Sequence, residues 1–386
     1  MSDTKAEAER LRRLFLFFAA TQGRGRSAVY EVLSEAAASN GDLIDLLLSA
    51  PVDQRRPSLL FAAVNLLLAE HPGAELAAYY PIHGGRRSPD SRLAPAFSAF
   101  CAQHRDELAR LLRDGSTQTN EIRRCVALRL GLDYVQRRWP GPVALVEAGA
   151  SAGLNLLFDR YRYRLSGHDV PGAVESPVTI SCEVKEDEVN EELPGGQLIG
   201  PLAEITSRLG FDQRPVDVAD PAQRAWLEAF IWPEQTGELA TLRGAIDLAL
   251  STGLATVVRG DAVTDTASLV KGLPGSEPVV VFTASLLSYL SAQARTAFAD
   301  QLRQAATRRP VAWVFAEAPG LLATVGLDKP ALGGPLAARN SLYLVGVSMR
   351  GPDFPDDDAL LALADPYLRW LAPARNSADD FRWLIA

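Results

Sequence analysis

The sequence predicts an α/β protein in which a mostly parallel β-sheet follows an all-helical region. Up to about residue 138, apolar residues recur only at the spacing of α-helices. After the segment Trp139-Pro140-Gly141-Pro142, short apolar runs rich in β-branched residues alternate with helical stretches. This alternation is typical of a parallel sheet that helices cover on both faces. We therefore expect a helical domain at residues 1–138 and a sheet domain at residues 139–386.

Glycine and proline clusters separate the expected helices of the first domain. These helices span residues 6–21, 28–38, 43–49, 58–70, 94–113 and 120–138. In the second domain we expect strands at 143–146, 256–259, 278–283 and 310–317, late strands at 341–349 and 367–371, a helix after the first strand that ends near Tyr161, and a helix at 292–308. Residues 167–200 break the alternation, so we interpret them as an insertion with one strand-like segment at 178–184.

The composition argues against several classes of function. The 386 residues carry a net charge of −8 and a pI near 5.2, whereas nonspecific nucleic-acid binding needs a basic surface. Cys101, Cys125 and Cys182 stand far apart, which favours reduced, buried thiols over a metal site. The acidic run at 183–192 lacks the spacing and glycine turn of a metal loop. Without a signal peptide or an apolar stretch of bilayer length, we expect a cytoplasmic protein with no membrane partner.

The most informative segment is the small-residue turn after the first strand, which fits two chemistries. Glu147, Gly149, Ser151 and Gly153 match the acidic-x-Gly-x-x-x-Gly loop that cradles S-adenosylmethionine in class I methyltransferases. The same residues 149–153 match the Gly-x-Ser-x-Gly turn of serine hydrolases, with Ser151 as the nucleophile.

The hydrolase interpretation lacks a catalytic base. His83-Gly84-Gly85 offers an upstream element for an oxyanion hole. In this fold, however, the catalytic histidine follows the serine and comes late in the chain. Of the four histidines, only His168 follows Ser151, and it precedes the rest of the sheet. The sequence therefore favours the nucleotide-binding interpretation over the hydrolase.

The nucleotide-binding interpretation needs small and acidic residues at strand ends, where ligands bind in open parallel sheets. A dinucleotide fingerprint fits poorly, because Ser151 replaces the second glycine and the third glycine is missing. Asp261 follows a strand and is placed to accept a hydrogen bond from an adenine amine, although a helix N-cap is the usual role of such a residue. The expected S-adenosylmethionine-binding residues are Glu147, Gly149, Ser151, Gly153, Asn155, Asp212, Asp261, Thr283 and Ser285. Among them, Asp212 is the candidate for the acid that binds the ribose.

Several motifs together resemble a bacterial family of unknown function, the domain-of-unknown-function family 2332. The motifs lie at residues 54–57, 79–81, 118–121, 147–161 and 232–235. The resemblance covers nearly the whole chain. It implies a Rossmann-like sheet domain similar to class I methyltransferases. One departure concerns a His-Pro-His-Gly-like element near the C-terminus of the family, where this chain has Asp365-Pro366-Tyr367-Leu368.

Methyl transfer needs residues that position a nucleophile and handle its proton. The expected catalytic residues are Asn120, Glu121, Tyr289 and Glu317, and the expected substrate-binding residues are Gln118, Thr119, Arg123 and Tyr80. Helix capping by Thr119 or Asn120 and packing by Tyr80 are the structural alternatives. The sequence thus predicts a methyltransferase-like enzyme that acts on a small polar substrate. A non-catalytic binding protein of the same fold is the alternative, and the oligomeric state is left open.

Overall fold

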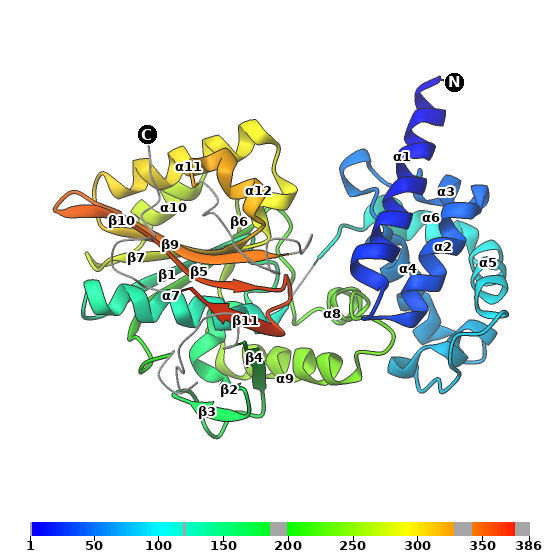
Figure 1. Cartoon of the computed structure of the whole chain (residues 1–386), viewed down its shortest axis with the longest axis horizontal. Helices are drawn as coiled ribbons and strands as arrows, with labels where there is room; N and C mark the ends of the chain where they lie inside the picture. The colour runs from blue at the N-terminus through cyan, green and yellow to red at the C-terminus, as the bar shows by residue number, and fades with distance from the viewer. Residues whose placement is uncertain (1, 119–120, 186–198, 328–341, 375–386) are drawn as a thin grey trace. The chain divides into compact units, whose positions relative to one another are not determined.

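The computed structural model describes residues 2–118, 121–185, 199–327 and 342–374. The chain forms two compact units (Figure 1). Residues 1–119 and 217–243 make up the first, which we call the helical unit. Residues 120–216 and 244–386 make up the second, which we call the sheet unit. None of the helices in the described ranges is both long and apolar enough to cross a bilayer.

The helical unit contains no strand among its described residues, as the helical spacing predicts. Its helices are α1 (Ser2–Phe18), α2 (Ala28–Ser39), α3 (Gly41–Leu47), α4 (Pro57–Glu70), α5 (Leu93–Gln103), α6 (Arg105–Asp114), α8 (Pro221–Glu228) and the first part of α9 (Thr236–Thr252). Short helical turns connect them at Ala19–Gly23, Val52–Gln54, Glu75–Tyr79 and Pro81–His83. Aromatic residues fill the core, where the rings of Tyr30 and Phe61 stack with centroids 4.4 Å apart. This burial stabilises the short helices, which would be only marginally stable as isolated peptides.

The prediction of a single helix at residues 94–113 is wrong. The segment 94–113 forms two helices, α5 and α6, because the backbone leaves helical geometry at His104, with φ −106° and ψ 26°. Asp106 and Glu107 lie in the first turn of α6. Acidic residues are favourable at that position because they complement the positive end of the helix dipole.

In the sheet unit, the described residues form one eleven-stranded sheet. Its strands are β1 (Val143–Ala148), β2 (Arg162–Leu165), β3 (His168–Val170), β4 (Thr179–Val184), β5 (Ile205–Asp212), β6 (Val257–Arg259), β7 (Val279–Ala284), β8 (Val311–Glu317), β9 (Tyr343–Gly351), β10 (Phe354–Ala364) and β11 (Trp370–Pro373). They lie in the order β3-β2-β4-β11-β10-β9-β8-β7-β1-β5-β6. The neighbours from β6 to β8 are parallel, whereas β9 and β10 run antiparallel to the strands before them. The mixed α/β architecture with a mostly parallel sheet agrees with the prediction.

The sequence analysis did not predict four of the strands, namely β2, β3, β5 and β10. We did not predict β5 because polar residues fill its first half, at Thr206, Ser207 and Arg208. We did not predict β10 because it begins with a run of aspartates, which are rare in strands, and continues with alanine and leucine, which favour helices. Pairing with β1 and with β9, respectively, overrides these local preferences.

The predicted α-helix after β1 is also absent. Residues Leu154–Arg160 form a kinked 3₁₀ segment instead, called η6. The Tyr161 hydroxyl donates to the Leu154 carbonyl oxygen at 2.7 Å, and Arg208 of β5 forms a two-point ion pair with Asp159 at 2.7 and 2.8 Å. These contacts fasten both ends of the segment in a short form.

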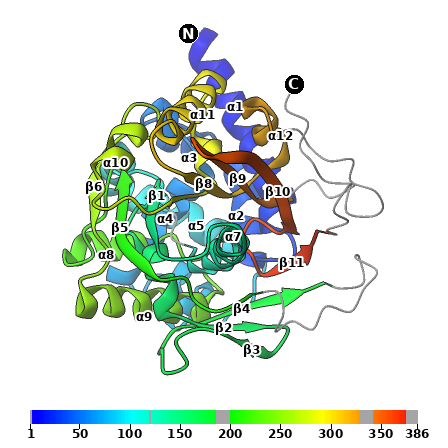
Figure 2. The same ribbon diagram turned by 90° about the vertical axis from the view of Figure 1, so that its left-hand side faces the viewer.

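Helices cover both faces of the sheet. On one face lie α10 (Thr266–Gly272), α11 (Ala292–Ala306) and α12 (Pro319–Leu322), and on the other lies α7 (Cys125–Arg138), around which the sheet curves (Figure 2). The short turns of this unit are η5 (Ile122–Arg124), η8 (Leu286–Tyr289) and η9 (Ala323–Val325). Helix α7 approaches β8 closely at Gly131, where a Cβ would lie 2.3 Å from a methyl carbon of Val314. The compact units thus group α7 with the sheet, whereas the sequence placed residues 120–138 in the helical domain.

The segment 167–200, which we interpreted as an insertion, contains β3 and β4. Both lie near the edge of the sheet opposite β6. The predicted strand-like segment at 178–184 corresponds to β4. Most of the acidic run, from residue 186 onward, lies outside the described residues. The three cysteines are buried free thiols, as expected.

We predict that Gly131→Ala destabilises the protein by about 1–3 kcal/mol, because the added methyl group overpacks the contact between α7 and β8. Chemical denaturation followed by circular dichroism measures the effect. Gly237→Ala is the matched control, since that exposed helical glycine has open space around its Cβ position and alanine favours the helix. Equal effects of the two substitutions would contradict close packing at Gly131.

Candidate functional site

The loop after β1 has a backbone that few residue types adopt. Gly149, Ser151 and Gly153 have positive φ angles of 75°, 50° and 70°. Glycine takes these angles without strain, whereas Ser151 needs its neighbours to hold it there. The amides of Gly149 and Ala150 donate to the carbonyl oxygen of Phe211 at 2.9 and 3.1 Å. The loop is therefore fastened to the end of β5.

Two acidic residues continue this arrangement along the neighbouring strands. Asp212 ends β5 and accepts a hydrogen bond from the Ser151 amide at 2.9 Å. Asp261 follows β6 and accepts a hydrogen bond from the Gln213 side chain at 2.8 Å. Asp261 also accepts one from the Val263 amide at 2.7 Å, so it caps the turn that follows. The carboxyl ends of β1, β5 and β6 are thus joined by side chains that sequence analysis proposed as ligand-binding.

Glu147 is a buried carboxyl with one unsatisfied oxygen. Its Oε1 accepts a hydrogen bond from the side-chain amide of Asn155 at 2.7 Å, and only 4% of the surface of Glu147 is exposed. Its Oε2 is buried and has no hydrogen-bond partner among the described residues. Burial raises the pKa of Glu147 to about 8, and the bond from Asn155 and the charge of Arg124 oppose this rise.

Arg124, between η5 and α7, crosses to the loop after β7. It donates to the carbonyl oxygen of Ala284 at 3.0 Å and to the hydroxyl of Ser285 at 2.7 Å. Ser285 has a positive φ of 65° and shares a 2.8 Å hydrogen bond with the Tyr343 hydroxyl. The Nε of Arg124 is buried without a partner in the described part of the chain. The charge of Arg124 lowers the pKa of both Glu147 and Glu317, so its guanidinium lies within electrostatic reach of both carboxyls.

Glu317 and Thr283 occupy the opposite side of the sheet from Glu147. Alternation along β8 places Glu317 on the face of Trp313, which packs against α11. Glu317 accepts hydrogen bonds from the amides of Leu286 and Leu287 at 2.9 and 3.3 Å, and burial raises its pKa to about 8. The Trp313 indole donates to the Thr283 hydroxyl at 3.0 Å. Both side chains are fully buried, where they order the turn after β7.

The other predicted residues lie in several places. Glu121 caps η5 and forms a 3.2 Å ion pair with Arg123. Tyr289 ends η8 and is 44% exposed. Gln118 and Tyr80 are buried residues of the helical unit. Thr119 and Asn120 lie outside the described residues.

Sequence analysis did not assign a role to Arg124 or Tyr343. It chose Arg123 from the same motif because neighbouring arginines cannot be told apart without knowing which one faces the sheet. The structure pairs Arg123 with Glu121 and directs Arg124 to Ser285. Tyr343 meets Ser285 across 58 positions of the chain, so no local pattern indicates it.

Within the sheet unit, the histidine that the hydrolase interpretation requires does not lie beside Ser151. The sheet unit contains one histidine, His168. It lies exposed on the edge strand β3, whereas Ser151 follows β1, eight positions away in the strand order. The Ser151 amide is bonded to an aspartate. This geometry does not assemble a serine–histidine pair.

A comparison with protein families matches residues 12–352 to the domain-of-unknown-function family 2332, described as an uncharacterized protein conserved in bacteria. The chain belongs to this family. No curated protein matches the chain. The Asp365-Pro366-Tyr367-Leu368 segment, where the resemblance led us to expect a histidine element, lies beyond the matched residues. Asp365 is buried and accepts hydrogen bonds from the amides of Arg369 and Trp370 at 2.6 and 3.3 Å, so this segment closes the turn between β10 and β11.

We predict that Glu147→Gln removes a pH-dependent loss of stability. The carboxyl is protonated in the folded state up to about pH 8 but ionised above about 4.5 when unfolded, so the wild type loses stability as pH rises through this window. The stability of the variant relative to the wild type should increase by roughly 1 kcal/mol per pH unit between pH 6 and 8. Denaturation curves at several pH values measure this difference. The exposed Glu175→Gln is the control, and parallel profiles for Glu147→Gln and the wild type would exclude the raised pKa.

Proposed function

We propose that the sheet unit binds S-adenosylmethionine at the carboxyl ends of β1, β5 and β6, and that the protein is a methyltransferase-like enzyme. One observation carries the proposal. The glycine loop after β1 is bonded to Asp212 at the end of β5, and the next residue, Gln213, is bonded to Asp261 after β6. Small residues that let a ligand approach the backbone therefore stand beside two acidic residues suited to hydroxyl and amine groups.

The strand order supports the same location. The chain leaves β1, later returns as β5 on one side of it, and then crosses to β7 on its other side. Ligands of open α/β sheets bind at such a switch point, outside the carboxyl ends of the strands. In class I methyltransferases, which the family resembles, the strand beside the glycine loop supplies the ribose-binding acid. By this resemblance Asp212 binds the ribose and Asp261 the adenine amine.

The unsatisfied atoms of Glu147 and Arg124 fit the amino-acid end of this cofactor. That end carries an ammonium group and a carboxylate. Glu147 Oε2 becomes a charged acceptor when an ammonium group ionises this carboxyl, and Arg124 Nε is a buried charged donor; neither atom has a partner in the described ranges. Unsatisfied buried polar groups are costly, so a ligand that satisfies both gains charge-assisted hydrogen bonds. Asn155 holds Glu147 in place for this contact.

The cofactor supplies a methyl group activated on a sulfonium, and the protein positions an acceptor in line with it. We assign the acceptor to the class of small polar molecules. The Glu121 carboxylate and the Arg123 guanidinium, at the start of η5, can form hydrogen bonds with such a polar acceptor. Asn120, Tyr289 and Glu317 complete the proposed catalytic residues of the sheet unit, whereas Gln118, Thr119 and Tyr80, also expected to bind substrate, belong to the helical unit.

A non-catalytic binding protein is the second candidate, and one observation favours it. Two of the proposed catalytic carboxyls already have structural partners, because Glu121 pairs with Arg123 and Glu317 accepts two backbone amides. Neither is an unengaged general base. A protein of this kind would bind the cofactor and transfer no methyl group.

We predict that the protein binds S-adenosylmethionine and S-adenosylhomocysteine, and that Asp261→Asn weakens both at least about tenfold through loss of an acceptor for the adenine amine. Isothermal titration calorimetry of the folded full chain measures the affinities. Asp300→Asn is the matched control, since Asp300 is an exposed residue of α11 paired with Arg303. Absence of heat with either ligand would refute the cofactor, and binding without turnover across a panel of small polar acceptors would favour the non-catalytic candidate.

We predict that Ser151 is not a hydrolytic nucleophile, because the one histidine of the sheet unit, His168, lies on the distant edge strand β3. Ser151→Ala should leave any cleavage of a p-nitrophenyl ester unchanged. A burst-phase assay of wild type and variant measures this. Ester cleavage that disappears with the Ser151 hydroxyl would restore the hydrolase interpretation.

A further inference from the structure

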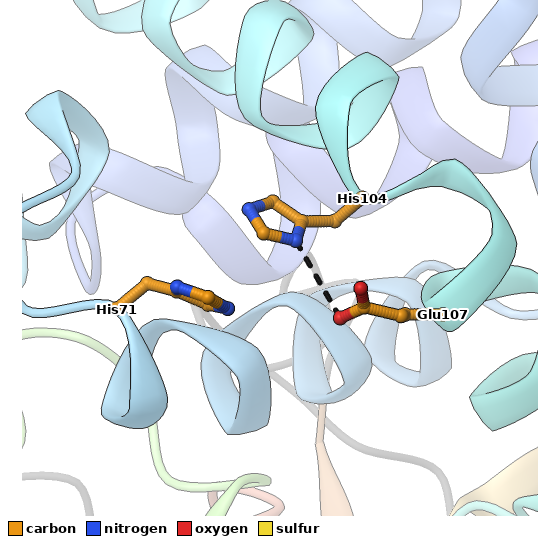
Figure 3. A group of neighbouring side chains, drawn as sticks. All are labelled: His71, His104 and Glu107. Carbon is orange, nitrogen blue, oxygen red and sulfur yellow. Dashed lines mark ion pairs between the residues drawn. The ribbon is translucent and has the colours of Figure 1, made fainter.

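A second group of chemically active side chains lies in the helical unit, apart from the proposed cofactor site. It consists of His71, His104 and Glu107, whose side chains point toward one another (Figure 3). Each offers one ligand atom, and the three atoms lie within 4.8 Å of one another. The closest pair is His104 Nδ1 and Glu107 Oε2, at 3.5 Å. All three residues belong to one compact unit.

The backbone places these residues at three helix ends. His71 is the C-cap of α4, and His104 separates α5 from α6. Glu107 follows three residues later in the first turn of α6, so it lies on the same side of the helix as His104. The ring of His104 is buried and packs against Phe100 with centroids 4.6 Å apart. This packing fixes one ligand before any ion binds.

The ligand chemistry is that of a first-row transition metal. Imidazole nitrogens and a carboxylate oxygen bind Zn²⁺ at about 2.0–2.2 Å, so two ligands of a tetrahedral ion stand roughly 3.3 Å apart. The 3.5 Å between His104 and Glu107 meets this spacing. His71 is partly exposed and meets the Phe100 ring edge-on, with centroids 6.2 Å apart, so a rotation of its ring brings its nitrogen to this spacing.

We propose that His71, His104 and Glu107 bind Zn²⁺ or a related divalent transition metal, with water in the fourth position. The ion would tie the end of α4 to the junction of α5 and α6, two segments that are more than 30 residues apart in the chain. Because the unfolded chain does not hold the three ligands together, binding stabilises the folded helical unit.

An ordinary ion pair between a protonated His104 and Glu107 is the competing explanation. The rings of His71 and His104 have centroids 4.3 Å apart, so protonating both places two positive charges side by side. A metal ion uses both rings in their neutral form. The two explanations therefore differ in the effect of added metal, because Zn²⁺ stabilises the folded unit only if these side chains bind it.

The test uses the full chain after treatment with a chelator, titrated with Zn²⁺ in competition with a chromophoric chelator at pH 7.5. We expect one equivalent to bind, and His71→Asn and Glu107→Gln each to weaken binding at least tenfold. Both residues are partly exposed, so these variants keep the buried His104 and its packing. His168→Asn is the matched control, because that histidine is exposed on β3 of the sheet unit.

Thermal unfolding supplies the second readout. Zn²⁺ should raise the midpoint of the wild type and of His168→Asn, and raise it less in His71→Asn and Glu107→Gln. Binding that is unchanged in both ligand variants, or less than one equivalent in the wild type, would overturn the proposal. Neither outcome bears on S-adenosylmethionine binding, which involves the other unit.

Discussion

The sheet unit depends on the parallel pairing of β1 between β5 and β7. Parallel neighbours end at the same edge of a sheet, so this pairing brings residues from distant parts of the chain to one place. The loop of Gly149 to Gly153 gains its partners there. Its amides bond to Phe211 and Asp212, which reach the loop only because β5 lies beside β1. The left-handed backbone of Ser151 is held by these same bonds.

The electrostatics of the site follow from burial more than from charge pairing. Glu147 and Glu317 lie on opposite faces of the sheet, and removal from water raises the pKa of each to about 8. Arg124 opposes both shifts, and donates to the turn that carries Ser285 between them. One oxygen of Glu147 and one nitrogen of Arg124 stay without partners in the described chain. Folded proteins retain few such groups, and a bound ligand is the explanation that we propose for these two.

The two units carry different chemistry. The sheet unit presents carboxylates, hydroxyls and backbone amides, which suit an organic ligand with many hydrogen-bonding groups. The helical unit presents two imidazoles and a carboxylate, which suit a metal ion. Sequence analysis expected no metal ligands and did not assign this group. The spacing of His104 and Glu107, three apart at a helix start, is the one signal that the sequence holds, and His71 joins them only through packing.

The sequence by itself determined the features that depend on neighbouring residues. Helical spacing predicted the all-helical first unit, and the small residues after β1 predicted a tight turn there, because periodicity and glycine content act locally. Only the tertiary structure decided which strands flank β1 and that β10 is a strand. It also decided that Arg124 and not Arg123 faces the sheet, and that the predicted helix at 94–113 is interrupted at His104. Each of these depends on contacts between residues far apart in the chain, whose energies outweigh the local preferences of the segments they join.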